Sequence, residues 1–311
     1  YLSNGRVGWN IVTGNGRSEH RALGTGTLDH DERYDHADEY MDVCYALWRG
    51  IPPEAILADR DGGVFADPSK IEKVVHDGKY FSCQATPSVL PSPKGRPVLF
   101  QAGSSSRGQR FAIKHADVVF AIQPDLARMQ AFMKQIRSAA VDYGREEDVR
   151  VTFAVQPFVA ENKAAAQAKR DEMLARIPME AALTRISGSF GVDLDTVDLD
   201  QPLQEIKTQS SPGLVKAMSA MFGDNDITLR EAVRLSGLAG LIPTVLGSPE
   251  EVADDLELIW RETGCHGFNL TPAIVPGGYE DFIDHVVPIP QSRGVFRTEY
   301  EATTLRGNLL A

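Results

Sequence analysis

A glycine- and serine-rich segment carries the clearest chemical signal in this sequence. Residues 103–108 read Gly-Ser-Ser-Ser-Arg-Gly, and they follow an apolar run over Pro97–Gln101. Backbone N–H groups and hydroxyls at a strand-to-helix junction can converge on an anion, because a helix N-terminus is partially positive. The segment matches neither the P-loop motif nor the dinucleotide fingerprint Gly-x-Gly-x-x-Gly. Residue types alone therefore leave two interpretations, a phosphate site or a solvated turn.

Two polar side chains in other segments could serve the same site. Asn10 lies in the run Val7–Val12, which we expect to be a buried strand. A buried amide needs hydrogen-bond partners, which are either backbone groups or a polar heterocycle. Tyr34 lies in the first turn of a helix expected over Asp31–Trp48. Its hydroxyl could reach an anion there, or its ring could belong to the core.

Other kinds of active site have little support. The 7 histidines lack His-x-His and His-Glu-x-x-His spacing, so we expect no metal site. A Gly-x-Ser-x-Gly elbow is absent, and a hydrolase triad is therefore unsupported. The 3 cysteines have no paired spacing, which argues against a disulfide framework and favours a reducing, cytoplasmic location. Composition and spacing identify no catalytic residue.

The composition narrows the range of partners. Asp and Glu number 43 against 32 Lys and Arg, which gives the 311-residue chain a net charge of −11. Such an acidic balance argues against nucleic-acid binding and against a polybasic membrane anchor. Apolar runs such as Val118–Ile122 are far shorter than the ~20 residues of a membrane span. We expect a small-molecule substrate.

Strand and helix patterns alternate along the chain and indicate an α/β fold. The expected strands are Val7–Val12, Pro97–Gln101, Asp117–Ile122, Val149–Ala160 and Gly267–Leu270. The helices expected between and after them are Asp31–Trp48, Gln109–His115, Pro124–Tyr143, Lys163–Arg176, Pro249–Thr263 and Tyr279–Val287. With no regular hairpins expected, five repeats of this alternation predict a parallel sheet, either doubly wound or part of a (β/α)₈ barrel.

Several long motifs resemble one family. They are Ser3–Thr13, His30–Tyr34, Gly63–Pro68, Gln101–Ser105, Cys265–Asn269 and Phe296–Glu301 with Thr304–Arg306. In this order they resemble the two-component flavin monooxygenases of the bacterial luciferase-like superfamily. The branch is that of nitrilotriacetate monooxygenase component A, dibenzothiophene-sulfone monooxygenase and pristinamycin IIA synthase. Because the motifs span almost the whole chain, their joint match is specific.

The resemblance implies a (β/α)₈ TIM barrel. The five expected strands would be strands four to eight, and the first three would be missing from this chain. Residues 1–311 would form a single barrel domain with insertions at about 51–94 and 177–246. A barrel closes only with all eight strands, so a truncated relative that binds flavin without activity is one alternative.

The resemblance also implies a cofactor and a reaction. Asn10 would hydrogen-bond the flavin ring of FMN, and Tyr34 with Gly103, Ser104 and Ser105 would hold its phosphate. A separate NAD(P)H-dependent flavin reductase would supply reduced FMN, which would react with O₂ to oxygenate a small organic sulfur, nitrogen or xenobiotic compound. The family pattern assigns no catalytic residue to this chain, and we expect a homo-oligomer.

The loop Gly14–Gly24 departs from the family pattern. It carries Arg17, His20 and Arg21 just after the first expected strand, where ligands of such folds bind. We expect these side chains to contact an anionic substrate, the alternative being a solvated loop.

A second alternative for the whole protein is a deazaflavin-dependent oxidoreductase of the same superfamily, which transfers hydride without O₂.

Overall fold

The computed structural model describes residues 2–14, 24, 28–90, 92, 95–103, 105–190, 198–205, 227–237, 240 and 242–310. Backbone contacts divide the chain into two compact units. Unit 1 comprises residues 1–119, 136–150 and 299–311, and unit 2 comprises residues 120–135 and 151–298. Within the described residues, no helix is long and apolar enough to cross a membrane.

Three parallel strands form the sheet of unit 1. Strand β6 (Val98–Gln101) pairs with β1 (Gly8–Asn10) on one side and with β7 (Val118–Ala121), whose first part belongs to this unit, on the other. Asn10 lies opposite Phe100, and Phe100 lies opposite Val118. Since parallel strands end at one edge, the segments following β1 and β6 emerge together there. The expected strands at these positions are confirmed, with shorter bounds.

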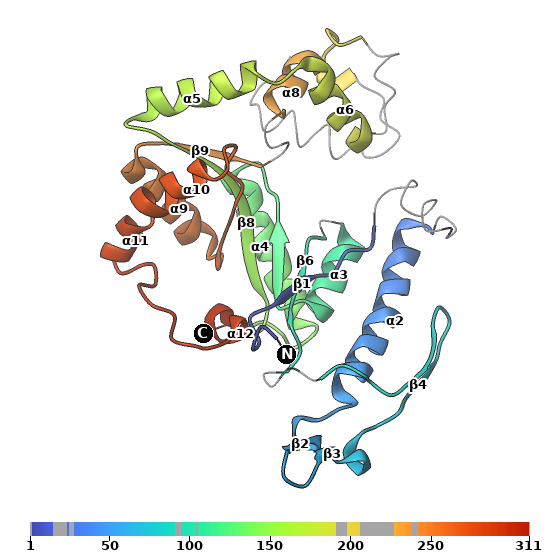
Figure 1. The fold of residues 1–311 in the computed structure, drawn as a ribbon. Helices are drawn as coiled ribbons and strands as arrows, with labels where there is room; N and C mark the ends of the chain where they lie inside the picture. The colour runs from blue at the N-terminus through green and yellow to red at the C-terminus, as the bar shows by residue number, and fades with distance from the viewer. Residues whose placement is uncertain are drawn as a thin grey trace. The chain divides into compact units, whose positions relative to one another are not determined.

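Two helices cover this sheet and build the core of unit 1. Helix α2 (His30–Arg49) runs beside α3 (Ser106–His115), as Figure 1 shows. Both helices contribute to one buried apolar cluster, made of Ile11, Tyr34, Ala37, Met41, Leu99 and Phe111. These α2 residues recur every three or four positions, which confirms the helical face expected from the sequence.

The segment after α2 contains two hairpins, so the expectation of no regular hairpins is wrong. Strand β2 (Ile56–Asp59) pairs antiparallel with β3 (Val64–Ala66), and β4 (Val74–Asp77) pairs with β5 (Ser82–Ala85). The β4–β5 turn is held by the Glu39 carboxylate of α2, which accepts the N–H groups of Tyr80 at 3.0 Å and Phe81 at 2.7 Å. Strands of three or four residues are too short to show an alternating pattern, and a tertiary contact fixes the second hairpin.

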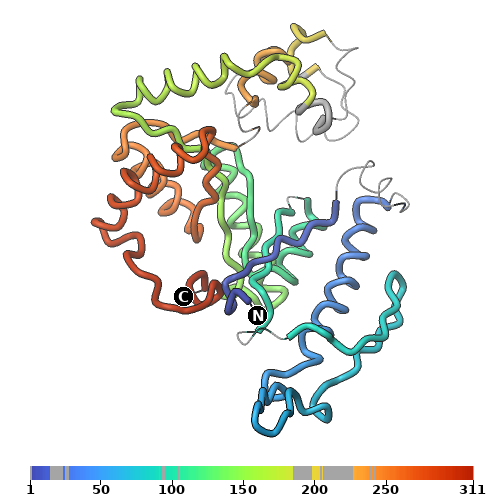
Figure 2. The backbone as a smooth tube through the Cα atoms, in the orientation of Figure 1, coloured from blue at the N-terminus to red at the C-terminus, as the bar shows by residue number. Residues whose placement is uncertain are grey.

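The C-terminal segment of unit 1 returns to the sheet through Asp117. This buried carboxylate accepts two hydrogen bonds from Arg96, at 2.7 and 2.9 Å, and two from Arg306 of α12 (Leu305–Leu310), both at 2.8 Å. Leu305 N–H also donates to Gly5 C=O at 3.1 Å, and the two ends of the chain lie close together in Figure 2. Two arginines on one carboxylate thus join segments far apart in the sequence.

The sheet of unit 2 is centred on one long strand. Strand β8 (Arg150–Val159) pairs in parallel through its first half with β10 (Gly267–Leu270) and through its second half with β9 (Thr244–Gly247). The sequence prediction missed β9, because a strand of only four residues gives no distinct alternating pattern. One buried apolar cluster of unit 2 is made of Val155, Val159, Val245, Val252, Ala253, Leu256, Phe282 and Val286.

Helices flank these strands. Helix α9 (Pro249–Thr263) begins at a capping box between Ser248 and Glu251 and ends at Gly264, whose φ is 63°, as its sequence predicts. The remaining helical elements include α4 (Leu126–Val141), α5 (Lys163–Ala175), α6 (Met179–Phe190) and α8 (Leu229–Leu235). In place of one last helix, the chain forms α10 (Gly277–Asp281), a π-helical turn (Phe282–Val286) and α11 (Pro288–Ser292).

Candidate functional site

The turn after β6 is folded tightly against the first turn of α3. Gly103 N–H donates to the Gln101 side-chain oxygen at 2.5 Å, which bends the chain directly after the strand. A Cβ atom on Gly103 would lie only 2.7 Å from the Gly108 carbonyl carbon. Glycine is therefore required at this position by close backbone approach, and the turn and helix form one cradle.

Ser105 begins the helix that follows. Its hydroxyl oxygen accepts the Gly108 N–H at 3.0 Å, the geometry of an N-cap. Gln109 N–H donates to Ser105 C=O, and the N–H groups of Ser106 and Arg107 are among those that helix geometry leaves without an intrahelical acceptor. Helix α3 therefore starts three residues earlier than its expected start at Gln109. The hydroxyl proton of Ser105 is still able to donate.

Tyr34 reaches the same cradle from α2. Its ring belongs to the core, 5.5 Å from the Phe111 ring, and the residue is 7% exposed. Its hydroxyl lies 2.6 Å from the position that a Gly108 Cβ would take, and the Ser105 hydroxyl lies 3.1 Å from that point. The two interpretations of Tyr34 thus both hold, because the ring packs in the core while the hydroxyl adjoins the turn. Tyr34, Gly103 and Ser105 are brought together.

Asn10 also lies at the carboxyl ends of the strands, but its side chain is not buried. Strand β1 is at the edge of the unit 1 sheet in the described part of the chain, and Asn10 and Val12 are exposed while Ile11 is buried. The strand expected within Val7–Val12 is present as β1, but the expectation that it is buried is wrong. An apolar run on an edge strand alternates between covered and open positions, and Asn10 falls on an open one.

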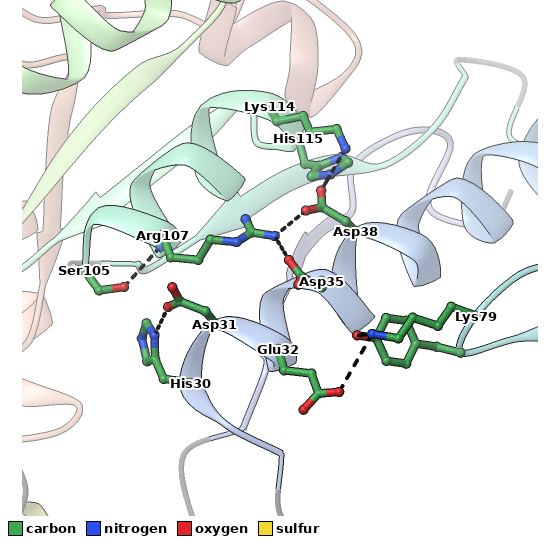
Figure 3. Close-up of polar contacts among 12 residues, drawn as sticks. His30, Asp31, Glu32, Asp35, Asp38, Lys79, Ser105, Arg107, Lys114 and His115 are labelled. Carbon is green, nitrogen blue, oxygen red and sulfur yellow. Dashed lines mark hydrogen bonds and ion pairs between the residues drawn. The ribbon is translucent and has the colours of Figure 1, made fainter.

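Charged residues surround the cradle on the α2 side, as Figure 3 shows. Arg107 donates to Asp35 at 2.8 Å and to Asp38 at 2.6 Å. Asp38 also accepts from Lys114 at 2.9 Å and from His115 Nε2 at 2.7 Å. Burial raises the pKa of Asp38, but these three hydrogen bonds outweigh it and hold the pKa well below its usual range.

Other predicted residues lie outside this geometry. Ser104, Arg17, His20 and Arg21 fall outside the described residues. Among the residues that are described, no three His, Cys, Asp or Glu side chains gather as metal ligands would.

Comparison with known proteins identifies the family. The family model for the luciferase-like monooxygenases matches residues 1–267. The dibenzothiophene-sulfone monooxygenase of Rhodococcus erythropolis is 37% identical over 315 aligned residues, which cover 99% of this chain and 70% of that enzyme. The chain belongs to the luciferase-like monooxygenases. This membership confirms the resemblance expected from the motifs and makes the protein an oxidoreductase.

Solved structures agree with this family assignment. The crystal structure of DmoA from Hyphomicrobium sulfonivorans superposes with a TM-score of 0.91 at 35% identity, over 100% of this chain and 66% of that protein. A riboflavin lyase crystallised with modified FMN and riboflavin gives a TM-score of 0.86 at 35% identity, over 100% of this chain and 69% of the lyase. The chain thus spans about two thirds of the length of these structures and has their α/β luciferase-like fold.

Two features of the site were not expected from the sequence. Gly108 precedes the expected helix start at Gln109, whereas it is a helical residue against which the Tyr34 hydroxyl packs. Asp35 and Asp38 are spaced three apart on α2, a spacing that places both on one face. That spacing was the available signal for a shared cation, but it does not name Arg107 as the partner.

Proposed function

We propose that this protein is a monooxygenase that uses reduced FMN and O₂. The observation that carries the proposal is the cradle of Gly103, Ser105 and Gly108 facing the Tyr34 hydroxyl. A Cβ at Gly108 would lie 2.6 Å from the Tyr34 hydroxyl, so glycine at this position lets that hydroxyl approach the first turn of α3. Two hydroxyls and the N–H groups at the start of α3 can donate to a phosphate, which accepts hydrogen bonds strongly. Ser104 lies between these residues in the sequence and would add a third hydroxyl.

The flavin ring would extend from this cradle along the carboxyl ends of the strands, toward the end of β1. Asn10, exposed at that edge, would hydrogen-bond the ring with its side-chain amide. Reduced FMN would supply the electrons that activate O₂, while the protein holds the ring and the substrate in place. We propose further that this chain forms part of a (β/α)₈ barrel, a fold in which ligands bind at the carboxyl ends of the strands.

The substrate would be a small organic compound. The Rhodococcus relative is named for a sulfone and the Hyphomicrobium sulfonivorans relative for dimethyl sulfide, which favours a sulfur compound. Arg17, His20 and Arg21 would contact the substrate if it is anionic. Replacing Arg17 and Arg21 with alanine would then raise KM without changing FMN affinity. An unchanged KM would remove these side chains from the substrate site.

A partner is implied by the same proposal. Another relative, from Aminobacter aminovorans, is named component A of nitrilotriacetate monooxygenase, 35% identical to this chain and 69% covered by it. By analogy, a separate NAD(P)H-dependent flavin reductase would deliver reduced FMN to this protein. The protein would need no nicotinamide site of its own.

The deciding experiment compares two reduced cofactors. Oxygen uptake would be recorded after adding reduced FMN or reduced deazaflavin, each with a panel of organosulfur substrates. The proposal predicts a hydroxylated or oxidised product together with substrate-dependent O₂ uptake with reduced FMN. Turnover with reduced deazaflavin and none with reduced FMN would instead support a hydride-transfer enzyme of the same superfamily.

A further inference from the structure

Arg107 lies between the cradle and an acidic pair on the neighbouring helix. It is the second residue of α3, and its side chain is 14% exposed. The guanidinium donates to Asp35 and Asp38, which are spaced three apart on α2. One guanidinium nitrogen, Nη2, donates to both carboxylates, and these two charged contacts hold the Arg107 side chain across the junction of the two helices.

The charge of this arginine is already balanced. Asp35 and Asp38 carry two negative charges, and Arg107 and Lys114 carry two positive ones. Asp38 is fixed from the other side by His115, which is 2% exposed. Because a carboxylate only accepts, His115 Nε2 donates to Asp38, while Nδ1 lies 3.1 Å from the Tyr45 hydroxyl. The cluster is therefore nearly neutral and rigid.

The same guanidinium lies over the ring of Tyr34. Its central carbon is 5.5 Å from the ring centroid, within the range of a cation–π contact. Phe111 packs on the ring at a centroid distance of 5.5 Å. Contacts with Arg107 and Phe111 thus restrict the ring, whose hydroxyl adjoins Gly108.

We infer that Arg107, held by Asp35 and Asp38, is a positioning residue that fixes the Tyr34 hydroxyl for the FMN phosphate. The inference rests on the proposed function, and it deepens the account of that same site. Arg107 acts through Tyr34 and not as a phosphate ligand, since its own charge is paired. A lysine at this position would keep the charge but lose the guanidinium group that lies over the Tyr34 ring.

The test compares the affinities of FMN and riboflavin, which differ only by the phosphate. Titrations would use the wild type, Arg107→Gln, Arg107→Lys, Tyr34→Phe and the double variant Tyr34→Phe/Arg107→Gln. Arg110→Gln, which changes an exposed arginine of the same helix, is the matched control. Unaltered riboflavin affinity also reports that each variant is folded.

We expect Arg107→Gln to weaken FMN binding by about three- to thirtyfold, the range that corresponds to a cation–π contact. Arg107→Lys should lose FMN affinity as well, and riboflavin affinity should stay within about twofold in every variant. If Arg107 acts through Tyr34, the double variant will bind FMN no more weakly than Tyr34→Phe alone.

Three results would contradict the role of Arg107 but leave the proposed phosphate cradle standing, provided that the wild type still binds FMN more tightly than riboflavin. These are unchanged FMN affinity in Arg107→Gln, full affinity in Arg107→Lys, and additive losses in the double variant. A wild type that binds FMN and riboflavin equally, or a Tyr34→Phe variant that keeps the preference for FMN, would instead overturn the proposed phosphate cradle and with it the role of Arg107.

Discussion

Replacing Asp117 with asparagine should strongly destabilise the protein. The Asp117 carboxylate is 3% exposed and accepts five hydrogen bonds, two each from Arg96 and Arg306 and one from Leu99 N–H at 2.8 Å. Asparagine has nearly the same size but carries no charge, and it places an NH₂ group against guanidinium donors. Breaking a buried ion pair in this way costs about 3–5 kcal/mol.

The exposure of the two arginines sets the expected value within that range. Arg96 and Arg306 are 29% and 31% exposed, so water partly solvates them when the carboxylate is lost. We therefore expect Asp117→Asn to lower the free energy of unfolding by about 3 kcal/mol, at the lower end of the range. Urea unfolding measures this directly, with an unchanged m value as the check that the folded state is intact.

A matched control separates burial from ion pairing as such. Asp200 forms a similar two-point pair with Arg230, at 2.7 and 3.0 Å, but is 65% exposed. Asp200→Asn should lower the free energy of unfolding far less than Asp117→Asn does, because water solvates both groups of an exposed pair. If Asp117→Asn lowers the free energy of unfolding no more than Asp200→Asn does, the hydrogen bonds of Asp117 with Arg96 and Arg306 do not hold the C-terminal segment as described.

Further predictions follow from the same contacts. Burial raises the pKa of Asp117, but its arginine and backbone hydrogen bonds outweigh this and lower the pKa to about 2. Its contribution is then complete above the unfolded pKa near 4 and lost as pH falls through about 2, so acid unfolding of Asp117→Asn should show a shallower pH dependence than that of wild type. Gly108→Ala places a Cβ 2.6 Å from the Tyr34 hydroxyl and should weaken FMN binding in fluorescence titration by about tenfold, through loss of a hydrogen bond to a charged group. Glu39→Gln removes the anionic acceptor of the β4–β5 turn, so hydrogen exchange at Phe81 N–H should accelerate while exchange in the core strands stays unchanged.

Elements with a long and regular pattern could be predicted from the sequence. The apolar face of α2 and the capping box of α9 each rest on local signals, and both helices begin within one residue of their expected positions. The hairpins β2–β3 and β4–β5 and the strand β9 could not be predicted in this way, because three or four residues are too few to establish an alternation. Their pairing depends on tertiary contacts.

The candidate site, like the fold, could be predicted from the sequence only in part. Gly108 suggests a turn by propensity, yet it lies in helix α3, and glycine is needed there because a Cβ would lie 2.6 Å from the Tyr34 hydroxyl. The turn and Tyr34 suggested an anion site among other possibilities, and only the family resemblance connected them. The pairing of Asp35 and Asp38 with Arg107 is set by how α2 and α3 pack, which charge spacing along one helix does not reveal.

The affinity for FMN of a variant lacking both cradle hydroxyls tests the central claim most directly. Tyr34→Phe with Ser105→Ala removes two donors to the phosphate, each worth about 1.5–3 kcal/mol when the acceptor is charged. Tyr40→Phe, which removes a hydroxyl elsewhere on α2, serves as the control, and thermal unfolding checks the loss of the Ser105 N-cap. The proposed site predicts an FMN affinity at least about tenfold weaker in the double variant and unchanged in the control. An unchanged FMN affinity in the folded double variant would contradict it.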